Sequence, residues 1–385
     1  MGKDNKILMN RRHVLKTLSM GAVAYGLAGC TSSPAGLKKS DPDVPAYTGH
    51  GKKATWEKVT SPSNVSLIKG NDPRDNTYNA LMNIEDEIMA SLEGKKRALI
   101  KVNFVVVTNP LVATNVESVR GILDFLKPRF KGTIEIGEAT VSGAQGSGIE
   151  GEGTMKGFED YGYMPLVDEY GVKLVDLNLE PHQTLTIFNT SGNKPQPIRV
   201  IQNYLDRDQY LISAGKMKTH NCVLVTLSLK NILMGAPKND YATQNDKFLM
   251  HSWDLSTLNF ADPDFKLVLE KDMVLHYNLF RMAQHTFPDL AVVDAWESME
   301  GDGPIDGTPV DTRMALASLD PVALDFLGTK IMGFDPNEVL YLSSMYEAGM
   351  GQGDFSKINV IGANVDDNLF KFKPHKDLAE PYGLI

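Results

Sequence analysis

Apolar runs and amphipathic segments alternate through the first half of the chain. Residues 98–107 form a near-continuous β-prone run, which is typical of a strand covered on both faces. Asn115 is placed to cap an amphipathic helix. Residues 133–137 and 172–177 predict two further strands, with a helix around residues 158–170 between them. This βαβαβ order predicts a Rossmann-like α/β fold, with a mostly parallel sheet and helices on both faces.

The second half of the chain adds strands to the same pattern. Asp320 and Pro321 begin a helix that should run to Ile331, where Gly333 can end it. We find no internal repeat, so residues 65–385 are interpreted as a single α/β domain, preceded by a flexible, Ser- and Pro-rich tether at residues 30–64. The further strands are expected at residues 209–213, 290–295, 314–317 and 358–361.

The first 30 residues have the pattern of an export signal. Arg11 and Arg12 precede a weakly apolar stretch at residues 18–28, which is too short to span a bilayer as a helix. The sequence Leu-Ala-Gly-Cys that ends at Cys30 resembles the lipobox of a bacterial lipoprotein. We therefore predict a twin-arginine lipoprotein signal peptide at residues 1–29 and lipid attachment at Cys30; an ordinary signal with a chance cysteine is the alternative.

This signal implies both a cellular location and a set of partners. The protein should meet the twin-arginine translocase and the lipoprotein-processing machinery. It should then remain in the cell envelope, outside the cytoplasm, on the periplasmic face or the cell surface. Stable anchoring requires more than one acyl chain. Because the twin-arginine route carries folded proteins, a cofactor inserted before export is expected.

Charge and cysteine content exclude some classes of function. Residues 1–29 carry five basic side chains and one acidic one, so the remainder holds 34 Lys and Arg against 47 Asp and Glu, a net charge of about −13. Such a chain is a poor candidate for binding nucleic acid. With Cys30 acylated, only Cys222 remains, so an iron–sulfur cluster held by four cysteines is excluded. Cys222 lies in an apolar run and should be a buried, inert thiol.

The richest candidate site lies at residues 213–221, directly after a predicted strand. It contains Lys216, Lys218 and His220, and ligands of open α/β sheets bind beyond the carboxyl ends of strands. Lys230 and Asn231 follow ten positions later in an otherwise apolar segment. Grouped lysines suit a phosphate or a carboxylate, and a desolvated lysine can form a covalent link to a carbonyl. A solvated lysine on a helix surface is the alternative for Lys230.

Other motifs are less specific. The acidic turn at residues 294–304, which includes Glu300, could present carboxylates to a metal or could be a solvated turn. His220 and His251 could together hold a transition metal, although single histidines are more often structural. Residues 146–151 match the dinucleotide-binding fingerprint formally but lack the strand-to-helix context, so we interpret them as a loop over a site.

Several of these motifs resemble the bacterial and archaeal family catalogued as domain of unknown function 362. The resemblance spans about residues 97–362, and the family name implies no activity. Many members resemble ferredoxin fusions with cysteine-rich segments, which this chain lacks. The matching motifs are Lys101-Val102-Asn103 and residues 215–220, 229–231, 300–304 and 318–325.

A second resemblance is to the nickel-pincer lactate racemase family. That family has a histidine, a cofactor-bearing lysine ten positions later and a further metal-binding histidine; His220, Lys230 and His251 fall in this order. The chain lacks the earlier acid–base histidine of that family and has Ser228-Leu229 where a glycine pair is usual. The resemblance implies a site that could take a transition metal or a nickel-type organic cofactor, without implying racemisation.

These observations favour a metal- or organic-cofactor-dependent enzyme acting on a small anionic substrate. His220 would be a metal ligand or general base, and Lys230 would hold cofactor or substrate. The alternatives are a non-catalytic surface lipoprotein that binds a small anionic ligand, and a scaffold of an envelope redox complex. The residues expected to contact substrate or cofactor are Asn103, Lys216, Lys218, Asn231 and Glu300, and His220 and His251 are the expected metal ligands.

Overall fold

The computed structural model describes residues 58–142, 153–189, 194–241, 244–251 and 269–379. The predicted signal peptide, Cys30 and the glycine-rich segment at residues 146–151 lie outside these ranges. No helix in the described ranges is long and apolar enough to cross a membrane.

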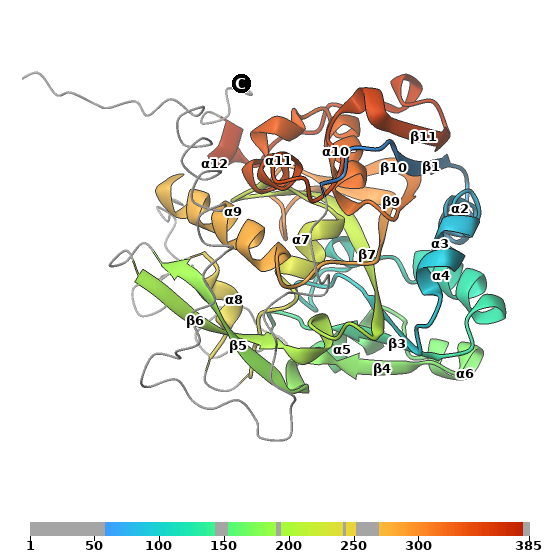
Figure 1. The fold of residues 1–385 in the computed structure, drawn as a ribbon, viewed down its shortest axis with the longest axis horizontal. Coiled ribbons are helices and arrows are strands. Elements are labelled where there is room, and N and C mark those ends of the chain that lie inside the picture. The colour runs from blue at the N-terminus through green and yellow to red at the C-terminus, as the bar shows by residue number, and fades with distance from the viewer. Residues whose placement is uncertain (1–57, 143–152, 190–193, 242–243, 252–268, 380–385) are drawn as a thin grey trace, which may run out of the picture.

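A nine-stranded sheet forms the centre of the molecule (Figure 1). Five adjacent strands, β9–β7–β2–β3–β4, are mutually parallel, whereas β10 runs antiparallel to both of its neighbours. The predicted parallel sheet is therefore confirmed, with an antiparallel portion added at one side. The strand order is β11 (Ile358–Gly362), β1 (Ser63–Lys69), β10 (Thr308–Ser318), β9 (Leu290–Glu300), β7 (Gln209–His220), β2 (Arg97–Lys101), β3 (Thr133–Glu138) and β4 (Lys173–Asp176), and β8 (Leu224–Thr226) pairs with β7.

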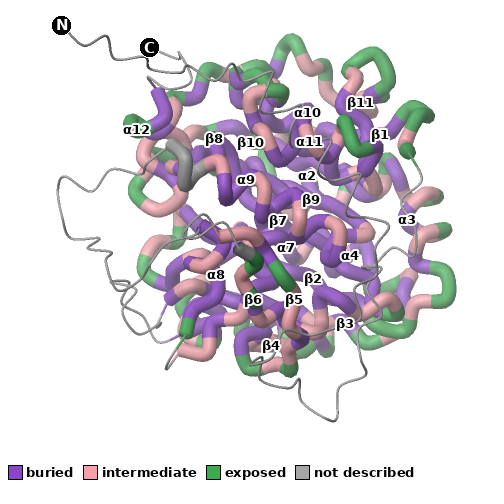
Figure 2. The backbone as a smooth tube through the Cα atoms, turned by 60° about the vertical axis from the view of Figure 1, so that its left-hand side comes forward, coloured by how far each residue is buried: buried purple, intermediate pink, exposed green. Residues whose placement is uncertain are grey.

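Helices cover both faces of the sheet, as the apolar runs predict. Leu99 and Ile100 are neighbours in β2 and are both buried, but their side chains join different core clusters on opposite faces. One cluster contains α2 (Pro73–Met82), α3 (Glu85–Leu92) and α4 (Val116–Arg129). The other contains α7 (Ser228–Leu233), α9 (Leu269–Ala283), α10 (Pro321–Ile331) and α11 (Leu340–Glu347). The strands between them are buried in the tube view (Figure 2).

Smaller elements complete the fold. A separate antiparallel hairpin consists of β5 (His182–Asn189) and β6 (Lys194–Ile201). Short helices are α5 (Thr154–Asp160), α6 (Leu166–Tyr170), α8 (Asp246–Leu249) and α12 (Lys376–Ala379). Short 3-10 turns occur at Pro110–Val112, Leu177–Leu179, Gln202–Tyr204, Pro336–Glu338, Phe355–Lys357 and Asp366–Asn368.

Predictions based on capping chemistry are confirmed. The Asn115 side chain accepts a hydrogen bond from the backbone N–H of Glu117 at the start of α4. Asp320 caps α10 with Pro321 in its first turn. That helix ends at Ile331, and Gly333 follows with a φ of 90°. The strands predicted at residues 133–137, 172–177 and 358–361 are also present.

Strand and helix boundaries require several corrections. The strand predicted at residues 98–107 ends at Lys101, and Val105 has a φ of 61°, which no regular strand accommodates. The strand predicted at residues 209–213 instead continues to His220, because β8 folds back and pairs with its second half. Strands β9 and β10 are likewise longer than predicted, since they pair with each other.

Two further boundaries differ from prediction. The helix predicted around residues 158–170 is two short helices, α5 and α6, interrupted at Gly162, which has a φ of 78°. The last two residues of the predicted tether, Ser63 and Asn64, belong to β1, where they pair with β11. The spacing of apolar residues predicts which positions are buried. It does not predict how far a strand continues, because that depends on the neighbouring strand with which it pairs.

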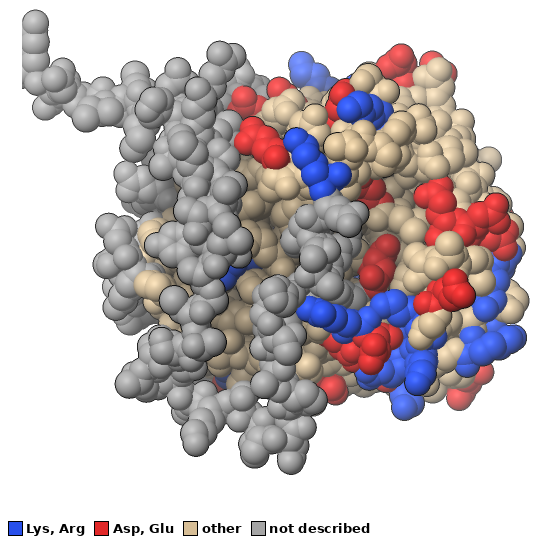
Figure 3. Space-filling model, viewed as in Figure 1, with Lys and Arg blue, Asp and Glu red and all other residues tan. Residues whose placement is uncertain are grey.

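Charged side chains of both signs are interspersed on the described part of the face in Figure 3. Several of the charged side chains in the described ranges form ion pairs, such as Arg74 with Asp124, and Arg120 with Glu117 and Glu169. Exposed pairs of this kind contribute little to stability, about 0–1 kcal/mol each. The described part of this face therefore has no continuous basic surface.

Candidate functional site

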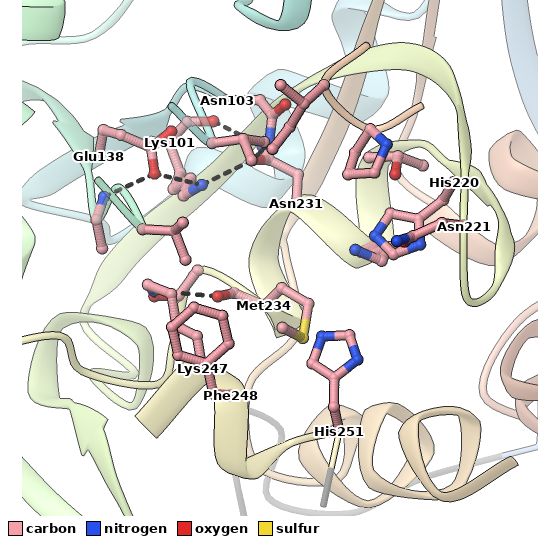
Figure 4. Close-up of a pocket in the computed structure, with 18 of the residues that line it drawn as sticks. Lys101, Asn103, Glu138, His220, Asn221, Asn231, Met234, Lys247, Phe248 and His251 are labelled. Carbon is pink, nitrogen blue, oxygen red and sulfur yellow. Dashed lines mark hydrogen bonds and ion pairs between the residues drawn. The ribbon is translucent and has the colours of Figure 1, made fainter. Parts of the chain in front are cut away.

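The carboxyl ends of three parallel strands meet at a cavity of about 350 Å³. Lys101 is the last residue of β2, Glu138 the last of β3 and His220 the last of β7, and all three line it (Figure 4). This is the edge at which open parallel sheets bind ligands. The sequence-predicted residues Asn103, Lys230, Asn231 and His251 line the same cavity.

A buried ion pair forms one wall. Lys101 Nζ lies 2.9 Å from Glu138 Oε1, and both side chains are only 2% exposed. Glu138 also accepts hydrogen bonds from the backbone N–H groups of Phe104 and Ala139, each at 2.7 Å. Burial lowers the pKa of Lys101, and the charge of Glu138 opposes that shift. The pair is therefore locally neutral and fully hydrogen-bonded, which is the condition for a buried ion pair to persist.

Asn231 joins α7 to the end of β2. Its Oδ1 accepts hydrogen bonds from Lys101 Nζ at 2.8 Å and from Asn103 Nδ2 at 3.2 Å. Its Nδ2 donates to the backbone oxygen of Lys101 at 3.0 Å and to Ser213 Oγ at 3.1 Å. All the hydrogen-bonding capacity of this amide is used by protein groups, so Asn231 orients its neighbours.

Lys218 lies beneath the cavity. Its Nζ donates to Asn103 Oδ1 at 2.7 Å and to the backbone oxygen of Val112 at 3.0 Å, and its side chain is fully buried. Burial and then the charges of Lys230 and Lys216 hold its pKa well below the ordinary value. Lys218 is not among the residues that line the cavity. It holds Asn103 in place, a supporting role in place of the predicted ligand contact.

The N-terminus of α7 is fixed by a carboxylate from α10. Asp325 Oδ1 accepts hydrogen bonds from Ser228 N at 3.0 Å and Ser228 Oγ at 2.6 Å, and its Oδ2 accepts one from Leu229 N at 2.9 Å. Burial raises the pKa of Asp325 to about 7 despite these bonds. This contact fixes the first turn of α7 and thereby the direction in which the side chain of the next residue, Lys230, points.

Lys230 differs from the other buried lysines of the site. Its side chain is 7% exposed and lines the cavity, yet it makes no hydrogen bond or ion pair with any residue in the described ranges. Burial lowers its pKa to about 8, with a small opposing effect from Cys222. Lys230 lines the same cavity as His220 and His251, and its charge lowers the pKa of both imidazoles.

Both imidazoles are neutral. His220 Nδ1 accepts a hydrogen bond from the backbone N–H of Cys222 at 3.0 Å, so the ring proton resides on Nε2. Burial holds the pKa of His220 well below its ordinary value and lowers that of His251 to about 3. Cys222 is buried, as predicted, and its Sγ lies 3.7 Å from His251 Nδ1. In this arrangement His220 is a hydrogen-bond donor through Nε2.

The arrangement suits the predicted metal site poorly. Within the described ranges no group of three or more His, Cys, Asp and Glu side chains is placed to hold a metal ion. A ligand or general base needs a free ring lone pair, and the Nδ1 lone pair of His220 is occupied by Cys222. His220 and His251 therefore share the cavity without forming a recognisable ligand set in the part of the chain described.

Three lining residues, Lys101, Glu138 and Lys247, were not assigned a role from sequence. Lys247 Nζ donates to the backbone oxygens of Met234, Gly235 and Pro237 at 2.7–3.1 Å, and burial lowers its pKa to about 7. A Cβ at Gly235 would lie 2.6 Å from Lys101 Cε, so only glycine fits there. The sequence signals were the family-like motif Lys101-Val102-Asn103 for Lys101 and, for both residues, a lysine within or beside a buried run, which is costly unless paired.

Two predicted site residues lie elsewhere. Lys216 forms a buried ion pair with Asp294 at 3.0 Å and does not line the cavity. The pairing of β7 with β9 shifts register between Lys216 and Lys218, so regular alternation along β7 is interrupted there. Glu300 Oε2 accepts a hydrogen bond from the backbone N–H of Lys373 at 2.9 Å and also lies outside the lining. Of the predicted acidic turn, only Pro304 reaches the cavity, followed by residues 305–306.

Comparison with known proteins gives a family but no activity. The family described as "Domain of unknown function (DUF362)" matches residues 98–330. A thylakoid-associated protein of Synechocystis sp. is 24% identical over 192 residues, which cover 50% of this chain and 51% of the relative. The chain thus spans about half the length of that curated relative. A crystal structure of a Thermotoga maritima protein is 12% identical with a TM-score of 0.39, covering 74% of this chain and 60% of that one.

Proposed function

Since this chain belongs to the DUF362 family, whose name assigns no activity, we propose its function from its own cavity. The protein is an exported, lipid-anchored protein that binds a small organic anion, a carboxylate or a phosphate ester, at Lys230. The observation that carries this proposal is the Lys230 ammonium, which lines a cavity without any partner among the described residues.

The balance of charge favours an anion. Lys101 is neutralised by Glu138, and Lys247 is held by three backbone carbonyls. The charge of Lys230 has no such compensation from the described residues, although burying it carries a cost in free energy. An oppositely charged ligand group 4 Å away would contribute roughly 4 kcal/mol at an effective dielectric of about 20. The His220 Nε2–H supplies a neutral donor beside it.

The cavity also limits ligand size. Its volume of about 350 Å³ lies at the lower end of the range of roughly 300–1,000 Å³ found for small-molecule sites. This suits a compact metabolite, and it is too small for a folded segment of another protein.

Thermal-shift measurements test this proposal directly. Acetate, pyruvate, citrate, inorganic phosphate and a phosphorylated triose would be compared with uncharged glycerol. A ligand at about 100 times its Kd should stabilise the protein by roughly 2.7 kcal/mol. Lys230→Ala should abolish the shift, whereas Lys373→Ala, at a side chain that is 79% exposed, should preserve it. An unchanged shift in the Lys230 variant would refute the proposal.

The proposed location in the cell envelope rests on the sequence of the first 30 residues. Arg11, Arg12 and the Cys30 lipobox support export by the twin-arginine route and lipid attachment. Labelling cells of the native host with a radioactive fatty acid tests this. Label should appear on the wild-type protein and be absent from Cys30→Ala, which should leave the membrane fraction. Replacing both arginines with lysine should retain the precursor in the cytoplasm.

Chemistry on the bound anion is the second candidate, favoured by the two neutral imidazoles beside Lys230. His220 could donate a hydrogen bond from Nε2, and an organic cofactor with an anionic group could use the same lysine. Mass spectrometry of protein isolated from its native host, before and after denaturation, would reveal a retained cofactor. Turnover of a ligand identified by thermal shift would establish an enzyme.

A further inference from the structure

We propose that Lys230 is a nucleophile, and that the anion bound in the cavity is a carbonyl compound with which the lysine forms an imine. This inference deepens the proposed function and rests on it. It names the class of ligand as anionic carbonyl compounds, such as 2-oxo acids or phosphorylated ketones, and it gives Lys230 a covalent role.

Lys230 differs from Lys101, Lys218 and Lys247 in what its ammonium contacts. Lys101, Lys218 and Lys247 all direct Nζ at protein acceptors: Glu138 and Asn231, Asn103 and Val112, and three backbone carbonyls respectively. Each of these ammonium groups would have to break good hydrogen bonds before its nitrogen could attack a ligand. Lys230 has no such bond to the described residues, so its nitrogen reaches the cavity without that cost.

The surroundings of Lys230 also favour its neutral, nucleophilic form. The side chain is buried, and burial lowers its pKa most; Cys222 opposes this shift, and the charge of Lys101 adds to it. Desolvation and cationic neighbours are the means by which proteins activate a lysine for imine formation. The pKa of Lys230 is lowered to about 8, so a useful fraction of the amine is unprotonated near neutral pH.

The step itself balances within the two reactants. The lone pair of Nζ attacks the carbonyl carbon, a carbon–nitrogen bond forms and the carbonyl oxygen takes up a proton. The carbinolamine then loses its hydroxyl together with the second amine proton, so one water leaves and a carbon–nitrogen double bond remains. His220 lines the same cavity, and its Nε2–H is the neutral group that would hydrogen-bond the oxygen as negative charge develops on it.

Lys247 provides a matched control. It lines the same cavity, is equally buried and also has a lowered pKa, yet its Nζ is engaged by the carbonyls of Met234, Gly235 and Pro237. If burial alone makes a lysine reactive, Lys247 should form an imine as Lys230 does. If the amine must also be free of hydrogen bonds to the protein, only Lys230 should form one. The pair therefore separates the two explanations within one protein.

Borohydride trapping tests the inference. The full-length protein would be incubated with pyruvate, 2-oxoglutarate or dihydroxyacetone phosphate, reduced with sodium borohydride and digested for peptide mass spectrometry. We expect an adduct on Lys230 with at least one probe; for pyruvate its mass is that of pyruvic acid less one oxygen atom. The probe that reacts distinguishes a carboxylate from a phosphate ligand. Lys230→Arg should lose the adduct, and Lys247→Arg should retain it.

The outcomes separate this inference from the proposed function. Thermal stabilisation by these anions with no reduced adduct on Lys230 from any of the three probes would overturn the imine and leave anion binding in place. An adduct on Lys247 or on exposed lysines alone would also overturn it. Peptide mapping of the wild-type protein gives these results even if a variant fails to fold. Absence of both stabilisation and adduct would remove the proposed function as well.

Discussion

Lys101 and Asn231 exchange two hydrogen bonds across the carboxyl edge of the sheet. Lys101 Nζ donates to Asn231 Oδ1 at 2.8 Å, and Asn231 Nδ2 donates to the backbone oxygen of Lys101 at 3.0 Å. The two residues are separated by 130 positions in the chain. This reciprocal contact fixes α7, and thereby Lys230, against the end of β2.

Removing that contact should weaken both fold and site. Asn231→Ala leaves Lys101 Nζ without one acceptor and removes one hydrogen bond from each of three other buried groups, at an expected cost of about 1–3 kcal/mol in the free energy of unfolding. Urea unfolding measures this loss. Asn359→Ala, at an exposed position of β11, should change stability by less than about 0.5 kcal/mol. Equal effects of the two substitutions would contradict the role of Asn231.

The ion pair of Lys101 and Glu138 should show strong coupling. Lys101→Met leaves the Glu138 carboxylate buried without its cation and should cost about 3–5 kcal/mol. The double variant Lys101→Met, Glu138→Gln should recover part of that loss, because no isolated charge remains. A double-mutant cycle in urea measures the coupling, and simple additivity would show that the pair contributes nothing specific.

Lys230 should reduce the stability of the ligand-free protein. Its folded pKa of about 8 lies below the ordinary 10.5, a difference worth roughly 3 kcal/mol at about 1.4 kcal/mol per pKa unit. The cost is fully present below pH 8 and declines as pH rises from about 8 to 10.5. Lys230→Met should therefore unfold at higher urea concentration at pH 7, with the gain shrinking by pH 10. A less stable variant at pH 7 would contradict this.

Anion affinity should fall as pH rises through about 8, because Lys230 loses its charge there. Isothermal titration between pH 6.5 and 9.5 measures this, using a carboxylate without a carbonyl, such as acetate. Lys230→Arg stays charged and should flatten the profile; an equally steep profile in that variant would assign the titration to another group. The other charged or titratable groups around the cavity are Lys101, Glu138, Lys218, His220, Cys222, Lys247, His251 and Asp306.

Asp325 should act on the site through α7. Both oxygens of Asp325 accept hydrogen bonds, so in Asp325→Asn the new NH2 group must face another donor, either Leu229 N–H or the N–H and O–H of Ser228. We expect a loss of about 1–3 kcal/mol in stability and weaker anion binding, since Lys230 leaves the same turn. Asp335→Asn, at an exposed cap far from the cavity, is the control. Unchanged affinity in Asp325→Asn would show that α7 is positioned by packing alone.

Local chemistry made part of the fold predictable from sequence. The caps at Asn115 and Asp320 and the apolar runs of β2, β3 and β4 depend on neighbours a few residues away, so the alternation of strands and helices follows from the chain itself. The predicted export signal and the proposed lipobox at Cys30 are likewise short sequence patterns and do not depend on folding. The sequence also placed His220, Lys230, Asn231 and His251 among the site residues that the cavity brings together.

Tertiary structure decided how those residues are used. Strand β7 extends to His220 because β8 pairs with its last three residues. Its pairing with β9 places Lys216 opposite Asp294, and Lys218 donates a hydrogen bond to Asn103. Glu138 and Lys101 become partners only because β2 and β3 end side by side in a parallel register. The sequence does not show which of the lysines around the cavity are held by protein acceptors. Which one has no partner among the described residues depends on acceptors ten or more residues away, whose positions only the folded chain defines.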